Sequence, residues 1–186
     1  MTLKRFTVDG LQGGYSWVCE GFAKVMLEAP VWRDLDHQTS KEFEALLGPT
    51  SNDPSALSGP TITLSKALVD GIDPAALKTH LGGSDPGEKS LSLLRRFLTK
   101  MGDTENSVEV FAALQGFRSA GGVAHLGGSG AGAARQKLGI EGMSPLQAFV
   151  TITERLTEAL NHVADLVEAA PRESRDTTRI GAEYDR

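Results

Sequence analysis

The amino-acid sequence predicts an all-α fold, a helical bundle of four to five principal helices with an N-terminal helical extension. Apolar residues recur at steps of three or four over most of the chain, which is the spacing of a buried helical stripe. Several of these stretches carry capping residues, with proline in the first turn and glycine after the last. Strict apolar–polar alternation is rare, and the most strand-like piece, TITL at 61–64, runs directly into a helical pattern.

The first part of the chain contains three expected helices, at about 15–28, 40–47 and 60–70. The first carries apolar residues at helical spacing and stops before Pro30. Ser40 is the expected N-cap of the second. In the third, Pro60 takes the first helical position and the pattern ends near Gly71.

Three capped segments follow: Asp73 to Gly82, Asp85 to Gly102, and a helix that begins at Thr104. In the first two, we expect the aspartate to cap the helix, the next proline to take the first turn, and the glycine to close the end. The buried stripe expected for the second consists of Leu91, Leu94, Leu98 and Met101, and that of the third of Val108, Phe111, Leu114 and Phe117.

Glycine recurs between residues 121 and 142, and each glycine costs a helix roughly 1 kcal/mol relative to alanine. We therefore expect a helix end, a flexible loop at Gly127–Gly132 and a short helix near 132–138. The last helix has the clearest signals, because Ser144 and Gln147 match a capping box and Pro171 ends the pattern. Its expected buried stripe comprises Leu146, Phe149, Ile152, Leu156, Leu160, Val163, Val167 and Ala170.

Length and composition favour a single domain over 1–170, with the extension at 1–50 and a disordered tail at 171–186. The net charge of −5 argues against a protein that coats nucleic acid through bulk positive charge, but leaves a local basic site possible. Cys19 is the only cysteine, so no intrachain disulfide and no cysteine-based zinc site can form. These features, with no apolar run long enough for a transmembrane helix and no secretory signal, predict a cytoplasmic protein.

The segment Arg118-Ser-Ala-Gly-Gly-Val-Ala-His125 carries the candidate chemistry. On a continuous helix, a seven-residue step is nearly two turns, so both side chains would share a face. A guanidinium can bind phosphate through two hydrogen bonds, and an imidazole exchanges protons near neutral pH. Because the ribose 2′-OH can serve as an internal nucleophile, such a pair could cleave RNA without a metal. Arg155 and His162 have the same spacing, so spacing alone does not choose between the two pairs.

The sequence around Arg118 and His125 favours this pair over Arg155 and His162. The stretches SLLRRFLTKMG and SVEVFAALQGFRSAGGVAHLGG resemble a C-terminal segment of bacterial proteins of the HEPN (higher eukaryotes and prokaryotes nucleotide-binding) class. In that class a helix ends in a pattern similar to L-x-x-L-R-S-x-G-x-A-H, which Phe117 to Gly121 and Ala124-His125 match. The resemblance covers about 91–140 and extends loosely over 30–90. The class usually has a basic residue after the histidine, where this chain has Leu126.

The resemblance implies a HEPN-like domain of a bacterial antiviral defence or toxin system that forms a homodimer. The Arg/His pairs of two chains would then face one groove, where RNA is cut as in a metal-independent ribonuclease. By position, Arg118 would bind the phosphate and His125 would move the proton. Weaker candidates for RNA or phosphate contacts are Ser119, Arg135 and Lys137, although the motif itself assigns no such role to Arg135 or Lys137. No metal, cofactor or membrane is expected.

Two other functions stay open at this point. The first is a non-catalytic helical module for dimerisation or partner binding, which the acidic net charge, Leu126 and the Gly121-Gly122 pair favour. The second is a nucleotide or phosphate site in the loop Gly127–Gly132, whose backbone N–H groups precede a helix start. That loop lacks the residues of a Walker loop and no strand precedes it, so a flexible linker is its simpler interpretation.

Overall fold

The computed structural model describes residues 31–119 and 129–169. Their α-helices are α2 (His37–Glu44), α3 (Ser58–Ser65), α4 (Pro74–Leu81), α5 (Ser90–Lys100), α6 (Val108–Ser119), α7 (Ser129–Leu138) and α8 (Pro145–Ala169). A 3-10 turn, η1 (Pro54–Leu57), precedes α3, and a π-helical turn, η2 (Lys66–Asp70), continues it. The described ranges contain no strand, only a bridge between Trp32 and Ile72. The prediction of an all-α fold is thus confirmed, while the helix expected at 15–28 and the tail lie outside these ranges.

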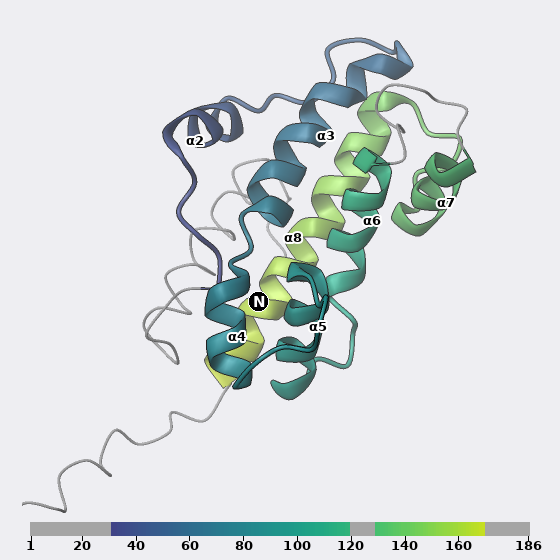
Figure 1. Cartoon of the computed structure of the whole chain (residues 1–186). Helices are drawn as coiled ribbons and strands as arrows, with labels where there is room; N and C mark the ends of the chain where they lie inside the picture. The colour runs from purple at the N-terminus through teal and green to yellow at the C-terminus, as the bar shows by residue number, and fades with distance from the viewer. Residues whose placement is uncertain (1–30, 120–128, 170–186) are drawn as a thin grey trace, which may run out of the picture.

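Helix α6 is the centre of the bundle, because it packs against α3, α5, α7, α8 and η2. Figure 1 shows the long α8 running beside α3 and α6, with α4 and α5 at one end of the bundle and α7 on the outer side of α6. The helix buries Phe111, Leu114 and Phe117 almost completely, as the spacing of these residues predicts. This packing fixes the last turn of α6, where Arg118 lies.

The capping box of α8 is present. The Ser144 backbone N–H donates to Gln147 Oε1 at 3.1 Å, and the Gln147 N–H donates to Ser144 Oγ at 3.4 Å. The prediction that Leu146 belongs to the buried stripe is wrong, because its side chain is 53% exposed. In the first turn of α8, Ala148 faces η1 and Phe149 covers Gly48, which leaves the side of Leu146 to solvent.

Two N-terminal helices begin earlier than the sequence predicts. Asp36, and not Ser40, caps α2, since its carboxylate accepts the backbone N–H groups of Gln38 and Thr39. Helix α3 begins at Ser58, so Pro60 lies in its first turn and not at its first position. In both cases a group upstream orients the first backbone N–H groups of the helix. For α2 this group is the Asp36 side chain, and for α3 it is the preceding 3-10 turn η1.

The cap of α4 is confirmed and that of α5 is not. Asp73 caps α4, and Gly82 ends it in the left-handed conformation at φ 71°. Helix α5 begins at Ser90, so the expected cap Asp85 is four residues too early to act on it. Gly87 at φ 80° turns the chain after Asp85 and delays the helix. An Asp-Pro pair followed by glycine therefore forms a turn here, although the same pair starts α4.

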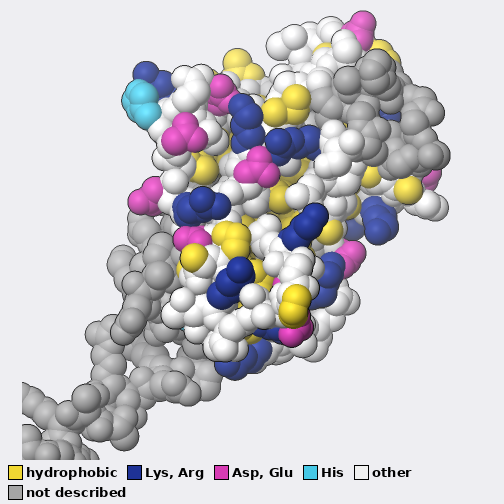
Figure 2. Space-filling model, viewed as in Figure 1, with side chains coloured by type: hydrophobic (Ala, Val, Ile, Leu, Met, Phe, Trp, Pro, Cys, Tyr) yellow, Lys and Arg dark blue, Asp and Glu magenta, His cyan; other side chains and the backbone are white. Residues whose placement is uncertain are grey.

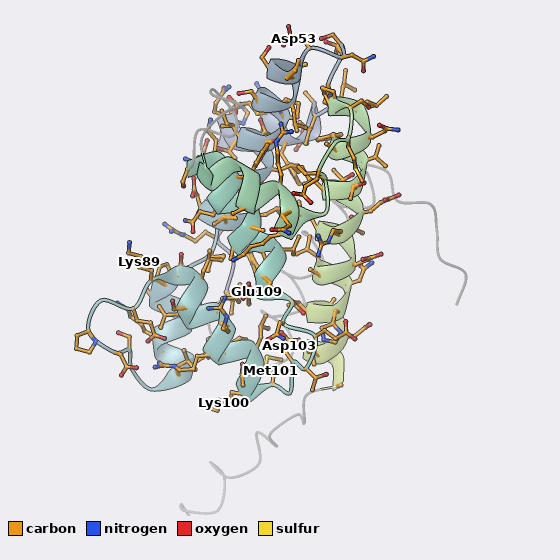
Figure 3. All side chains as sticks on the ribbon, turned by 90° about the vertical axis from the view of Figure 1, so that its right-hand side faces the viewer. Asp53, Lys89, Lys100, Met101, Asp103 and Glu109 are labelled. Atoms are coloured by element: carbon orange, nitrogen blue, oxygen red, sulfur yellow. The ribbon has the colours of Figure 1, made fainter. Side chains whose placement is uncertain are left out.

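The starts of α6 and α7 also differ from the prediction. Asp103 accepts hydrogen bonds from the backbone N–H groups of Glu105 and Ser107, which forms a turn, and α6 begins only at Val108. Figure 3 shows Asp103 between the end of α5 and α6, close to the last turns of α8. Helix α7 begins at Ser129, so residues 129–132 of the expected flexible loop are helical.

Across both described ranges, none of the helices combines the length and the apolar character needed to cross a membrane.

Candidate functional site: the Arg118 contact and its groove

Arg118 is held in place by two residues from the α3–η2 region. Its Nη1 donates to Asp70 Oδ2 at 2.6 Å and to Ser65 Oγ at 3.3 Å. Ser65 is buried at the end of α3, and Asp70 is the last residue of the π-helical turn. The Arg118 side chain remains 36% exposed. The last turn of α6 thus presents an oriented guanidinium at the surface.

The ion pair with Asp70 does not use all the N–H donors of the Arg118 guanidinium. Both hydrogen bonds use Nη1, and no acceptor among the described residues contacts Nε or Nη2. An arginine carries five N–H donors in a planar fork, so the Nε–Nη2 edge retains the geometry that binds two phosphate oxygens. Asp70 lowers the net positive charge at this site while it fixes the orientation of the fork.

Asp70 also lines an open groove of about 360 Å³. Its described lining residues are Arg33, Asp34, Leu35, Asp36, Thr39, Lys66, Asp70 and Gly71. Lys66 Nζ lies 3.3 Å from Glu42 Oε2, and Arg33 Nη2 donates to the Ile72 carbonyl at 3.3 Å. Hydrogen bonds from the Thr39 backbone and hydroxyl lower the pKa of Asp36, so this carboxylate stays charged. The groove therefore has mixed charge.

The face of the molecule seen in Figure 2 also carries both signs of charge. Figure 2 shows Lys and Arg side chains interspersed with Asp and Glu on the face that carries α3 and α4, with no large area of one sign. Arg95 and Arg96 follow this pattern, because Arg95 pairs with Glu109, and Arg96 Nη1 lies 3.1 Å from Glu88 Oε2. Recognition of a long polyanion by bulk charge is thus not a property of this face.

The other predicted site residues are distributed around α6 and α7. Ser119 and Lys137 are exposed, and the Lys137 carbonyl accepts a hydrogen bond from Arg155 Nη1 at 2.7 Å. Arg135 is half-buried, with its guanidinium 5.7 Å from the centre of the Phe117 ring. Its contact is therefore with the side of α6 next to the one that carries Arg118. His125 lies outside the described residues, as does the first part of the glycine-rich loop.

The second Arg/His pair serves the packing of α8. Arg155 binds the end of α7, whereas His162 Nε2 lies 3.2 Å from Asp103 Oδ1 and its Nδ1 lies 3.7 Å from Glu105 Oε2. The approach to Asp103 lacks hydrogen-bond geometry, so the contact is electrostatic when the imidazole is protonated. The two side chains contact different neighbours of α8, which assigns them to helix packing.

Sequence reasoning selects Arg118 as a candidate but does not predict the residues that hold it. Ser65 and Asp70 precede Arg118 by 53 and 48 residues. No local pattern links them to α6. Within the described ranges, no cluster of three or more His, Cys, Asp or Glu side chains could hold a metal ion. Comparison with known proteins adds no family: no family model matches the chain, and no curated protein and no solved structure is significantly similar to it.

Proposed function

We propose that this chain is a HEPN-like domain that cleaves RNA as a metal-independent endoribonuclease of a bacterial defence or toxin system. The observation that supports this function is the state of Arg118. Asp70 and Ser65 hold the guanidinium through Nη1, the described residues offer no acceptor to Nε or Nη2, and Asp70 also lines the groove. A fixed guanidinium with two free, parallel donors suits a phosphodiester whose negative charge increases in the transition state.

In the proposed reaction, Arg118 binds the non-bridging oxygens of the scissile phosphate. The ribose 2′-oxygen attacks phosphorus as its proton passes to a base, and the bond to the 5′-oxygen breaks as that oxygen takes up a proton from an acid or from solvent. The products are a 2′,3′-cyclic phosphate and a 5′-hydroxyl, so no water or metal is needed in this step. We assign the proton transfer to His125, on the basis of the motif and the pKa range of imidazole.

A homodimer is part of the proposal, because it would bring two Arg/His pairs to one groove. A single Arg118 site supplies limited positive charge, since Asp70 is paired with it and the groove contains further carboxylates. Two copies of the site would contact two successive phosphates, which raises affinity without a strongly basic surface.

The test is cleavage of a fluorophore-labelled single-stranded RNA in the presence of EDTA. We expect Arg118→Gln and His125→Gln each to lower the rate by at least about 100-fold, the range of a lost transition-state donor or proton-transfer group. The matched control is Arg155→Gln with His162→Gln, which removes the same residue types at the same spacing. Equal loss in both sets, or cleavage that persists without Arg118 and His125, contradicts the proposal. Circular dichroism checks that each variant folds.

A second function is a non-catalytic module for partner binding. The observation that favours it is an apolar strip at the start of α8, where Leu146 is 53%, Val150 43% and Met143 37% exposed. Light scattering combined with the RNA assay separates the two functions. A stable oligomer without cleavage, which a Leu146→Glu, Val150→Glu variant converts to a monomer, supports the module. An active enzyme whose oligomeric state these substitutions do not change supports the ribonuclease alone.

A further inference from the structure

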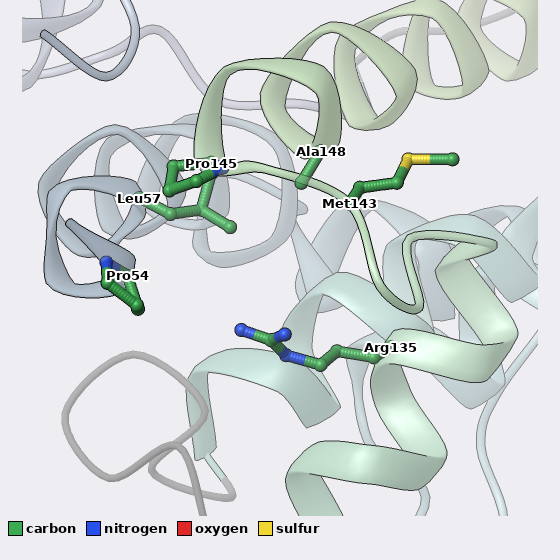
Figure 4. A pocket seen from close by; sticks show the side chains of 6 residues that line it. All are labelled: Pro54, Leu57, Arg135, Met143, Pro145 and Ala148. Atoms are coloured by element: carbon green, nitrogen blue, oxygen red, sulfur yellow. The ribbon is translucent and has the colours of Figure 1, made fainter. Parts of the chain in front are cut away.

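Arg135, whose guanidinium lies over the Phe117 ring of α6, also lines a small pocket. The pocket has a volume of about 160 Å³, and its described lining residues are Pro54, Leu57, Arg135, Met143, Pro145 and Ala148. These residues come from η1, from α7 and from the start of α8. Figure 4 shows the guanidinium of Arg135 extending into the space between Pro54 and Leu57 on one side and Met143 and Ala148 on the other.

The charge of Arg135 has no carboxylate partner in the described part of the chain. Its guanidinium lies over the face of Phe117, and its Nε is buried without a hydrogen-bond acceptor among the described residues. Burial of a cationic donor that lacks an acceptor is unfavourable, and native proteins rarely retain it without a reason. Arg95, Arg96 and Arg118 each have an acidic partner, so this arrangement is not general for the arginines of the molecule.

The walls of the pocket narrow the class of ligand. Apart from Arg135, every described lining residue is apolar, which does not suit a hydrated inorganic anion or a nucleic-acid backbone. A protein cavity of about 150 Å³ accommodates a molecule the size of benzene. One guanidinium at one end then matches one carboxylate, because the two Nη groups can donate to both of its oxygens.

We propose that this pocket binds a small monocarboxylate with a compact apolar body, such as an aromatic acid. The carboxylate accepts hydrogen bonds from the Nη groups of Arg135, and the ring lies between Leu57 and Ala148. Bound in this way, the ligand bridges η1, α7 and α8, and therefore stabilises the arrangement of these elements. The site is separate from the Arg118 contact and does not depend on RNA cleavage.

Isothermal titration calorimetry with benzoate as the probe tests this proposal on the full chain. We expect saturable binding of benzoate, and binding at least about tenfold weaker for benzyl alcohol, which keeps the ring but lacks the charge. Inorganic phosphate, which keeps a charge but lacks the ring, should also bind at least about tenfold more weakly. Equal binding of phosphate and benzoate would indicate a simple anion contact and overturn the proposal, as would a flat benzoate trace up to about 10 mM.

Three variants locate the site. Arg135→Gln should weaken benzoate binding at least about tenfold, whereas Lys137→Gln, an exposed cation on the same helix, should leave it unchanged. Ala148→Leu fills the pocket from α8 and should abolish binding while the charge of Arg135 remains. Unchanged affinity in either Arg135→Gln or Ala148→Leu contradicts the assignment. A melting curve recorded for each variant ensures that only folded protein is compared.

Discussion

Two half-buried arginines lie at the last turn of α6 and have different surroundings: Arg118 belongs to that turn, and Arg135 of α7 lies over the ring of the preceding residue, Phe117. Arg118 meets the carboxylate of Asp70 at 2.6 Å, on the side of the mixed-charge groove. Arg135 covers the ring of Phe117 beside an apolar pocket, and the described residues supply no carboxylate to it. The fold itself explains the first arrangement, since the ion pair connects α6 to η2. The second leaves the guanidinium without an acceptor among the described residues, and the proposed ligand would supply one to its Nη groups.

The largest effect should come from the residue that supports Arg135. Phe117 is 1% exposed, and Phe117→Ala removes a core ring next to Arg118. We expect a loss of about 3–5 kcal/mol in the free energy of unfolding, measured by urea denaturation. Phe117→Leu should cost less than about 1.5 kcal/mol, because it preserves most of the volume. Equal losses in the two variants would show that Arg135 stacking on the ring, and not ring volume, determines the stability here.

Substitution by methionine should change the stability of the fold in opposite directions at the two arginines. Arg135→Met replaces a half-buried cation, whose Nε has no acceptor among the described residues, with an apolar side chain, and we expect an increase in stability of up to about 1 kcal/mol. Arg118→Met leaves Asp70 unpaired, and we expect a decrease of about 1 kcal/mol. Thermal and urea unfolding of both variants measure the difference. A clear loss of stability in Arg135→Met would mean that its contact with Phe117 outweighs the cost of the buried charge.

A smaller expected effect is the salt dependence of the coupling energy between Arg118 and Asp70, which should distinguish this pair from Arg135 and Phe117. In a double-mutant cycle with Asp70→Asn and Arg118→Gln, we expect a coupling energy of about 0.2–1 kcal/mol, since both side chains are partly exposed. The coupling should decrease between about 0.05 M and 1 M sodium chloride because salt screens exposed charges. The corresponding cycle for Arg135→Gln with Phe117→Leu should respond less to salt. Identical responses would remove the contrast between the two sites.

The smallest effect is a shifted titration in the groove. Hydrogen bonds from Thr39 lower the pKa of Asp36 below its ordinary value of 3.8. A carboxylate with a lowered pKa stabilises the fold at pH values above 3.8, and this contribution is lost as the pH falls through the lowered pKa. In Thr39→Val, the pKa of Asp36 should rise towards 3.8, as measured by carbon-detected NMR of the carboxyl group. An unchanged pKa in Thr39→Val would assign the shift to the remaining backbone hydrogen bonds, such as those from Gln38 and Thr39.

Local signals in the sequence predict much of the fold and little of the site. The caps of α4 and α8 are correct because aspartate, serine, proline and glycine act on backbone groups only a few residues away. The start of α5 is wrong for the same reason, since Gly87 converts a capping pattern into a turn. The exposure of Leu146 depends on which neighbours reach the first turn of α8, and helical spacing does not contain that information.

The site depends on contacts between distant segments. Arg118 is identifiable from its motif, but its partner Asp70 belongs to a stretch that the sequence marks only as the end of a helix. The pocket of Arg135 requires η1, α7 and α8 to meet, and each contributes ordinary apolar residues that carry no ligand signal of their own. Packing brings these groups together, so only the folded chain distinguishes the two arginines.

Because of the π-helical turn, the number of residues between α3 and Gly71 determines whether Asp70 can reach Arg118. A π turn spans one residue more than an α-helical turn, so a deletion within Lys66–Asp70 would restore a regular helix. It would also change the rotation and rise of the later residues relative to α3, because a π turn and an α turn differ in both. Asp70 would then leave Arg118, and the Gly71 carbonyl would leave the Arg33 N–H, which it contacts at 2.9 Å. A shortened chain could therefore keep its hydrophobic composition and still lose the orientation of the guanidinium.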